Sequence, residues 1–495
     1  MTSDWEMVIG LEVHGELNTA TKLFCGCRNE FGSEPNTNVC PVCLGLPGSL
    51  PVLNKKVVEY AMRLGEALHC EIRASIFHRK NYFYPDMPKD YQISQYDEPI
   101  NVSGYLELSD GGTDGDGVGA PSSGGAGVQG TRRGHSKVGI ERAHIEEDTG
   151  KSTHVGGGGR IHEAGHSLVD YNRAGVPLVE IVSAPDLRTA EGARAYVSEL
   201  RSILLAIDVS DARMEEGSMR VDANVSVHRP DEPYGTRCEI KNLNSLRSLG
   251  RAIEFEARRQ IELIEAGERV IQQTRHWDEN EGRTHTLRSK EEAFDYRYFP
   301  EPDLVPVVPD DELRAAVKAS LPMLPAERRV RLAEAAGVEP PEAAMAVERG
   351  LDELALAAIA AGGDPRRLLT HIEHNLAGAG PDAIDAAAFA RLVQMEVGGQ
   401  LTATQAKQVL ADMLESGRGP DEIAADRGFE AMGSDVLATA VDEVIAANPD
   451  AWAKYVAGED KVAGMFVGQV MKATKGQADG KAVTALLQER RSRGV

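Results

Sequence analysis

The sequence predicts an α+β fold in which a largely antiparallel sheet domain is followed by two all-helical domains. Through about residue 300 the chain carries short alternating runs rich in Val and Ile, broken by Gly, Pro and Asn, which is the pattern of strands. A Pro-rich segment, 299–306, then marks a boundary. Beyond it Ala, Leu and Glu recur at helical spacing. A chain of 495 residues is also too long for one hydrophobic core.

The first expected domain covers residues 1–300. Two Gly-rich tracts interrupt its strands, at 111–134 and 156–159, and their composition predicts loops. A stretch rich in Arg, Glu, Ile and Ala, 245–267, predicts a helix within this domain.

The second expected domain covers residues 301–419 and is helical. Thr402 followed by Gln405 is a capping-box pattern, and the helix that it starts should end near Gly417. The Gly and Pro residues at 417–420 then separate a final helical domain, 420–495.

Composition and charge indicate a cytoplasmic protein that makes only local contacts with nucleic acid. The first residues lack the basic and apolar regions of a signal peptide, and six cysteines in so long a chain are not a disulfide scaffold. The net charge of −23 repels a phosphate backbone, so any RNA contact needs a local basic patch. One such patch is 457–495, where seven basic and four acidic side chains give a net charge of +3. A solvated helix face is the alternative explanation.

Several predicted strands have one apolar and one charged face, because successive side chains of a strand point to opposite sides. Glu12 and His14 share the face opposite the apolar residues of 7–13, and His144 and Glu146 repeat this spacing. A third strand carries polar residues on one face, which are Arg220, Asp222, Asn224, Ser226 and His228. The ordinary solvated face of an antiparallel sheet is the alternative. Clustered carboxylates, however, suit Mg²⁺ in phosphoryl transfer.

The sequence offers no credible nucleophile for releasing ammonia and no P-loop. Lys151 and Ser152 end a P-loop-like string, but Ile145 stands where its first glycine should be. Ser122 and Ser123 lie in a low-complexity loop without a framework that could position a nucleophile.

Four cysteines form two closely spaced pairs about a dozen residues apart. The four are Cys25, Cys27, Cys40 and Cys43. In a cytoplasmic chain this spacing fits a tetrahedral, structural zinc site, and buried free thiols are the alternative. Cys70 and Cys238 stand alone and are expected in the core.

Recognisable motifs are spread along the whole chain. They are 9–14 (IGLEVH), 79–86 (RKNYFYPD), 91–95 (YQISQ), 144–152 (HIEEDTGKS), 214–220 (MEEGSMR), 239–245 (EIKNLNS), 295–303 (DYRYFPEPD) and 468–477 (GQVMKATKGQ). Together they resemble the signature segments of one family, the aspartyl/glutamyl-tRNA(Asn/Gln) amidotransferase B subunits. The resemblance implies a cradle domain, a helical domain and a tail that is similar to the small YqeY proteins.

The resemblance also implies an activity, an ATP-dependent carbon–nitrogen ligase that uses glutamine as the amide donor. Such a protein phosphorylates the side-chain carboxylate of glutamyl-tRNA(Gln) or aspartyl-tRNA(Asn) with ATP and Mg²⁺. Ammonia then displaces the phosphate; it comes from the amidase, or A, component of a heterotrimer whose third and smallest component is the C chain. A separate amidase agrees with the missing nucleophile.

This chemistry assigns roles to residues of the matching segments. The expected Mg²⁺ shell is Glu12, His14, Glu146, Glu147 and Glu216. Lys80 and Tyr82 are expected to hold the substrate carboxylate or the γ-phosphate, although loop packing explains Tyr82 equally well. Weaker roles in binding substrate or ATP fall to Arg220, Asp222, Asn224 and Lys241. Lys472 and Lys475 become candidate phosphate contacts for the tRNA body.

Two other interpretations remain open. A non-catalytic tRNA-binding scaffold would use the helical tail, but a pure RNA cradle should show Lys and Arg where this sheet shows carboxylates. The large subunit of the related archaeal two-subunit enzyme needs an inserted domain for which this length leaves little room.

Overall fold

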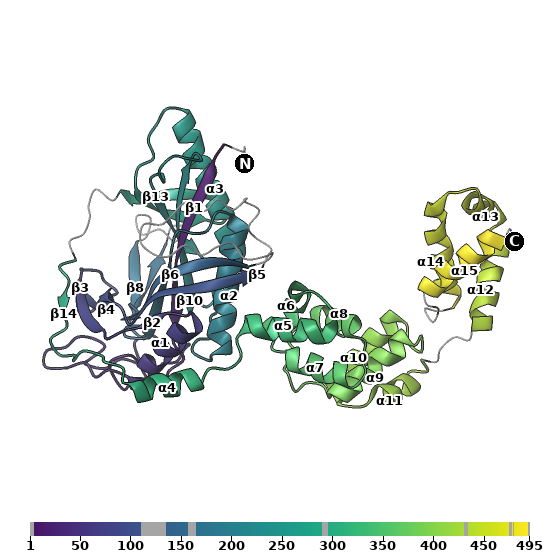
Figure 1. Ribbon diagram of the computed structural model, residues 1–495, viewed down its shortest axis with the longest axis horizontal. Coiled ribbons are helices and arrows are strands. Elements are labelled where there is room, and N and C mark those ends of the chain that lie inside the picture. The colour runs from purple at the N-terminus through teal and green to yellow at the C-terminus, as the bar shows by residue number, and fades with distance from the viewer. Residues whose placement is uncertain are drawn as a thin grey trace. The chain divides into compact units, whose positions relative to one another are not determined.

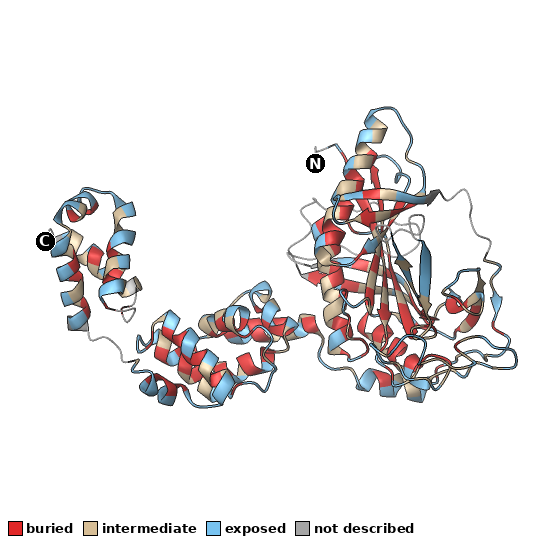
Figure 2. Cartoon of the chain, turned by 180° about the vertical axis from the view of Figure 1, so that it is seen from behind, coloured by how far each residue is buried: buried red, intermediate tan, exposed pale blue. Residues whose placement is uncertain are grey.

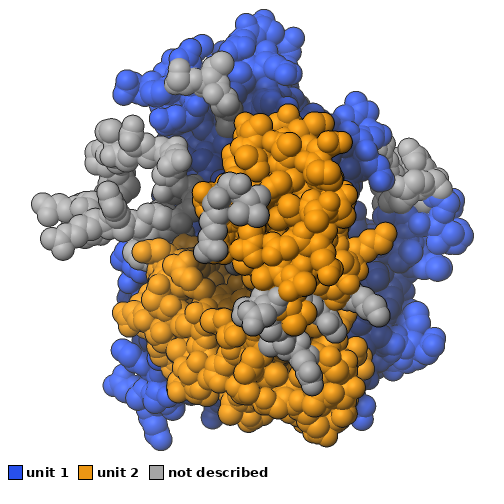
Figure 3. All heavy atoms as spheres, turned by 90° about the vertical axis from the view of Figure 1, so that its right-hand side faces the viewer, with its two compact units in different colours: residues 1–325 blue, residues 326–495 orange. Residues whose placement is uncertain are grey.

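The computed structural model describes residues 4–109, 135–156, 165–289, 296–429, 434–474, 478 and 480–493. The chain divides into two compact units, residues 1–325 and 326–495 (Figure 3). None of the helices in these described ranges is long and apolar enough to cross a membrane. The Gly-rich tract at 111–134, and the second tract apart from Gly156, lie outside the described residues.

The first unit is built on one large sheet. Its strands run in the order β13-β12-β11-β10-β1-β9-β6-β4-β3-β14, with β5 paired to β6 and β2 paired to β5. Their bounds are β1 (Glu6–Glu16), β2 (Glu71–Ile72), β3 (Ile76–Asn81), β4 (Tyr91–Glu98), β5 (Asn101–Ser109), β6 (His135–Glu147), β9 (Pro177–Ser183), β10 (Met219–His228), β11 (Cys238–Leu243), β12 (Gln273–Asp278), β13 (Arg283–Ser289) and β14 (Phe299–Pro300). A separate hairpin joins β7 (Lys151–Val155) to β8 (His166–Asp170).

The sheet is antiparallel except where β11 and β12 run parallel. That exception needs a crossover, which α3 (Leu246–Glu265) supplies between the two strands. The predicted helix at 245–267 is therefore confirmed, and its start is fixed by Ser245, whose hydroxyl accepts a hydrogen bond from the Ser248 backbone N–H.

Three helices pack on the apolar side of the sheet: α1 (Lys55–Ala67), α2 (Ala190–Ala206) and α3 (Figure 1). Along β1 the side chains of Ile9, Leu11 and Val13 are at most 1% exposed and share one core with these helices. Figure 2 shows such buried residues, in red, along the strands and along the helix faces that meet them. The alternate residues Glu12 and His14 point to the other face, as predicted. We call this charged side the open face, because it is the side opposite the one on which α1, α2 and α3 pack.

The second unit is helical throughout its described residues and has two hydrophobic cores. The first core holds α5 (Pro325–Ala336), α6 (Pro340–Glu348), α7 (Asp352–Ala360), α8 (Pro365–Asn375), α9 (Ala386–Val397), α10 (Ala403–Ser416) and α11 (Pro420–Asp426). The second holds α12 (Ser434–Ala447), α13 (Pro449–Val456), α14 (Ala463–Ala473) and α15 (Gly480–Arg493). The capping box of Thr402 and Gln405 is present, and Gly417 ends that helix with φ 70°.

The α+β fold class is confirmed, whereas the division at residues 300 and 419 stays a prediction. The first unit continues past the Pro-rich segment, because β14 pairs with β3 and Val317 of α4 (Asp311–Ala319) enters the sheet's core. Ile423 of α11 belongs to the first helical core. Composition locates these breaks only approximately, since core membership depends on contacts between distant segments.

Candidate active site and metal sites

Strand register brings a first group of charged side chains together on the open face of the sheet. His14 of β1 and His144 of β6 both lie opposite Glu180 of β9, the strand between them. The His14 Nε2 atom lies 3.2 Å from Glu180 Oε2 and 3.8 Å from Glu146 Oε1. His14, Glu146 and Glu180 each offer a ligand atom within 4.8 Å of the others, so the three could hold a metal ion.

A second group lies one row along the same face. Glu12 of β1 lies opposite Asp222 of β10, and together with Glu239 of β11 they offer three carboxylates within 4.8 Å. Asn224 Nδ2 donates to Glu12 Oε1 at 2.9 Å. Lys241 Nζ lies 2.5 Å from Asp222 and 2.9 Å from Glu239. This group could hold a cation through oxygen atoms alone, and the Lys241 ammonium already pairs with two of its carboxylates.

The two groups influence each other electrostatically. Burial and the carboxylates of Glu180, Glu239 and Asp222 raise the pKa of Glu12. Burial would lower the pKa of His14, but its hydrogen bond to Glu180 and the neighbouring carboxylates outweigh burial and raise that pKa to about 9. Burial also opposes the charged form of Lys241, whose pKa is nevertheless raised by its acidic partners. The face therefore concentrates negative charge that a cation would relieve.

Two residues of the predicted Mg²⁺ shell are not brought to either group. Glu147 follows Glu146 on β6 and so points to the other side of the strand, where its carboxylate pairs with Lys89 and accepts a 2.9 Å hydrogen bond from the Ile93 backbone N–H. Glu216 lies in the turn before β10 and pairs with Arg213 at 2.8 Å. Three of the five predicted shell residues thus share the open face.

Lys80 and Tyr82 lie in an aromatic cluster at the end of β3. The Lys80 Nζ atom is 5.9 Å from the centre of the Tyr82 ring and 5.1 Å from that of Tyr296. Burial and the nearby carboxylates of Glu146 and Asp86 raise the pKa of Tyr82, so the phenol keeps its proton. Tyr82 thus lies close enough to Glu146 to be affected by its charge.

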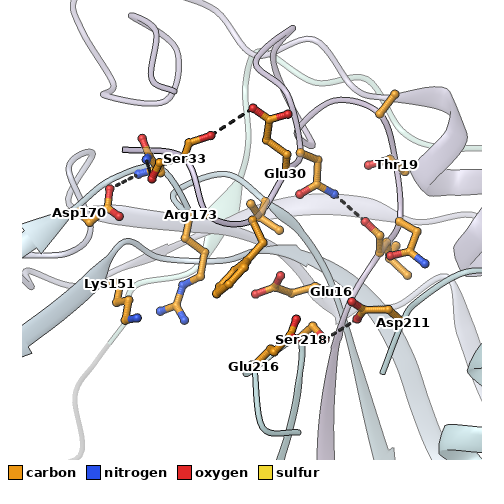
Figure 4. A pocket seen from close by; sticks show the side chains of 18 residues that line it. Glu16, Thr19, Glu30, Ser33, Lys151, Asp170, Arg173, Asp211, Glu216 and Ser218 are labelled. Carbon is orange, nitrogen blue, oxygen red and sulfur yellow. Dashed lines mark hydrogen bonds between the residues drawn. The ribbon is translucent and has the colours of Figure 1, made fainter. Parts of the chain in front are cut away.

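Arg220 lies at the end of the face near a pocket of about 660 Å³. Its guanidinium lies 2.7 Å from Asp148. Burial opposes the charged form of Asp148, but Arg220 and Arg173 outweigh it and lower the pKa of that carboxyl. Burial and Asp148 raise the pKa of the adjacent Glu16 to about 7. Figure 4 shows side chains of both signs around the pocket, among them Glu16, Lys151 and Arg173.

The four predicted zinc cysteines form one cluster. The Cys43 Sγ atom lies 3.4, 3.7 and 3.6 Å from the sulfurs of Cys25, Cys27 and Cys40, and none of them is in a disulfide. The fully buried Lys22 places its Nζ 3.6 Å from Cys43 Sγ. The hydrogen bond from the Cys25 thiol and the positive charge of Lys22 outweigh burial and lower the pKa of the Cys43 thiol to about 4. The cluster could bind a metal such as zinc.

Sequence reasoning missed Glu180 and Glu239 and gave His144 no role. Glu180 interrupts the buried run of β9, with Val179 and Ile181 on either side, and a charge inside such a run was the available signal. In the tail, Lys472 is exposed on α14, and Lys475 lies outside the described residues.

Comparison with known proteins identifies the family of this chain. A family model described as the GatB/GatE catalytic domain matches residues 7–315, and one described as the GatB domain matches 369–490. The aspartyl/glutamyl-tRNA(Asn/Gln) amidotransferase B subunit of Frankia casuarinae is 49% identical, over 98% of this chain and 95% of the relative. Proteins of the same name from Streptomyces avermitilis and Carboxydothermus hydrogenoformans are 47% and 45% identical, covering 99% and 98% of this chain and 96% and 99% of the relatives. The chain belongs to the family of aspartyl/glutamyl-tRNA(Asn/Gln) amidotransferase B subunits.

Proposed function

We propose that this chain activates the side-chain carboxylate of glutamyl-tRNA(Gln), aspartyl-tRNA(Asn) or both with ATP, and then converts it to the amide. The carboxylate oxygen attacks the γ-phosphorus, ADP leaves, and an acyl phosphate forms. Ammonia then attacks the acyl carbon, the bond to the phosphate oxygen breaks, and inorganic phosphate leaves. The observation that carries this proposal is the presence of two clusters of carboxylate side chains on the open face, together with the aromatic cluster that holds Lys80.

The donor atoms of the face fit Mg²⁺, which prefers carboxylate oxygens. Glu12, Asp222 and Glu239 would hold one ion, and His14 and Glu146 would belong to a second group. A bound divalent cation neutralises charge that develops on the transferred phosphoryl group. Glu147 and Glu216 are left out of this proposed shell, because their carboxylates belong to neither group and lie beside Lys89 and Arg213 instead.

The cationic and hydrogen-bonding side chains would hold the two anionic substrates together. Lys80 supplies a positive charge for the substrate carboxylate or the γ-phosphate, and the protonated Tyr82 hydroxyl can donate to the same oxygens. Lys241 and Asn224 hold Asp222 and Glu12 in place, and Arg220 fixes the next part of the face through Asp148.

The proposed partners follow from the name of the relatives, which are subunits of an amidotransferase. Ammonia would come from the amidase, or A, component of a heterotrimer that also includes the small C chain. The relatives' names specify acylated tRNA(Asn) and tRNA(Gln). Lys472, exposed on α14, and Lys475 are the proposed contacts to the tRNA backbone.

The four-cysteine cluster is proposed to hold a structural Zn²⁺. Four thiolates at about 2.3 Å from zinc stand about 3.8 Å apart in a tetrahedron. The sulfur distances of 3.4 to 3.7 Å from Cys43 are close to this value. The Lys22 ammonium would offset part of the net negative charge of a four-thiolate site.

The proposal is tested with this chain co-purified with its A and C partners. We would add ATP, Mg²⁺, glutamine and glutamyl-tRNA(Gln) and quantify glutaminyl-tRNA(Gln). Glu12→Gln should abolish the product while filter binding of the tRNA persists, and Glu59→Gln, a carboxylate paired with Lys56 on α1, should change neither. Normal product from Glu12→Gln would place the site elsewhere. Loss of tRNA binding alone would favour the scaffold interpretation.

A further inference from the structure

Four side chains close a ring around one point on the open face of the sheet. The His14 Nε2 atom lies 3.2 Å from Glu180 Oε2 and 3.8 Å from Glu146 Oε1. On the far side, His144 Nε2 lies 4.0 Å from the same Glu180 oxygen and 3.8 Å from Glu146 Oε2. Imidazole and carboxylate therefore alternate around the ring, and each carboxylate faces both histidines.

Within the described part of the chain, His144 makes no hydrogen bond that explains its place in this ring. Its side chain is fully buried, and neither ring nitrogen makes a hydrogen bond to the described residues. Ser94 of β4 pairs with Glu146 in the sheet and is 1% exposed. Its Oγ atom also lacks a hydrogen-bond partner among the described residues. Buried polar groups in folded proteins are normally satisfied, so His144 Nε2, which lies next to Glu146 and Glu180, is available to a further partner.

The ring differs in donor chemistry from its neighbour on the sheet. Glu12, Asp222 and Glu239 offer only oxygen atoms, which suits Mg²⁺. Two imidazoles and two carboxylates suit a first-row transition ion, because imidazole nitrogen is a common ligand of such ions, whereas Mg²⁺ is bound through oxygen. Ligands of one such ion, at about 2.1 Å each, stand about 3.0 to 3.4 Å apart. The edges of the ring run from 3.2 to 4.0 Å, so all but the shortest would have to contract for the four side chains to hold one ion.

We propose that His144 is a fourth ligand of the ion held by His14, Glu146 and Glu180, and that this ring selects a transition-metal ion such as Mn²⁺ over Mg²⁺. The inference rests on the proposed function, since it specifies one of that site's two metal positions. It assigns the two positions to different ions, Mg²⁺ to the all-oxygen group and a transition ion to the ring.

The test measures Mn²⁺ bound to the full-length chain without ATP or tRNA. Electron spin-echo modulation counts the imidazole nitrogens coupled to Mn²⁺, and the all-oxygen group contributes none. Two coupled imidazoles are expected in the wild type and one in His144→Gln. His228→Gln, which removes another buried histidine, should keep both. Titration should show Mn²⁺ bound more tightly than Mg²⁺ at the nitrogen-coupled site.

One coupled imidazole in the wild type, or equal competition by Mg²⁺, would overturn the inference. If His144→Gln fails to fold, judged by circular dichroism, His144→Asn and the wild-type nitrogen count still decide. Amide formation does not enter this measurement. A wild type with two coupled imidazoles and no amidation would therefore reject the proposed function alone, and the reverse result would reject the inference alone.

Discussion

Removing the cation of the buried Lys89–Glu147 pair should destabilise the first unit. The Lys89 side chain is 10% exposed and that of Glu147 is 4% exposed. Lys89→Met keeps a long side chain but leaves the carboxylate buried with the Ile93 backbone N–H as its remaining donor of those described. Breaking a buried pair from one side costs about 3–5 kcal/mol. Since the hydrogen bond from the Ile93 backbone N–H to Glu147 persists, we expect the free energy of unfolding to fall by about 3 kcal/mol, the lower end of this range.

The assay is urea denaturation followed by tryptophan fluorescence in a Trp452→Phe background, where the first unit alone reports through Trp5 and Trp277. Lys56→Met, which breaks an exposed pair, is the matched control and should cost less than about 1 kcal/mol.

A second substitution separates the pair from other effects of the mutation. Adding Glu147→Gln to Lys89→Met should cost less than the sum of the single changes, by about 2 kcal/mol, because the uncompensated charge disappears. A loss below about 1 kcal/mol for Lys89→Met, or additive costs, would refute the account of Glu147 as a structural carboxylate.

Three further predictions concern other parts of the chain. Lys22→Met should lower zinc retention against a chromophoric chelator, whereas Lys22→Arg should restore part of it; equal retention by all three proteins would contradict the role of the ammonium. Thr402→Ala should lower the melting temperature of the helical core through loss of about 1 kcal/mol of capping, and an unchanged transition would count against it. Burial would raise the pKa of Glu396, but His371 and Arg367 outweigh it and lower that pKa. The carboxylate therefore stabilises the fold above its unfolded pKa of 4.5, and this stability is lost as the pH falls through the lower folded pKa. In Glu396→Gln the free energy of unfolding should therefore fall less steeply with decreasing pH in the acid range. An unchanged slope would refute the stabilising role of the Glu396 carboxylate.

Local alternation was enough to predict which side of a strand a residue occupies. Glu12 and His14 point to the face opposite that of Leu11 and Val13. Predicting this needs only the rule that successive side chains of a strand alternate between its two faces. The same rule already separated Glu146 from Glu147, since neighbours on one strand cannot share a face. The predicted shell includes both, so it stays a prediction that the alternation of a single strand does not explain.

Strand order was beyond what the sequence could supply. Glu180 meets His14 because β9 lies between β1 and β6, although the two residues are separated by 166 positions in the chain. Glu239 joins Glu12 through two successive strand pairings. Such long-range pairings are set by the packing of the whole core, and no local pattern encodes them. The cysteine cluster was easier, because its spacing is itself the signal.

The long strand β6 limits which changes of length this protein can accept during evolution. It carries His144 and Glu146 toward the open face and Glu147 toward Lys89, so both of its sides are committed. Deleting or inserting one residue within it would exchange the two sides and bury the wrong carboxylate. The glycine-rich tract at 111–134 instead falls between β5 and β6, ahead of the committed stretch. Length can vary there without shifting the register of His144, so insertions among relatives should gather before β6 and be missing from 140–147.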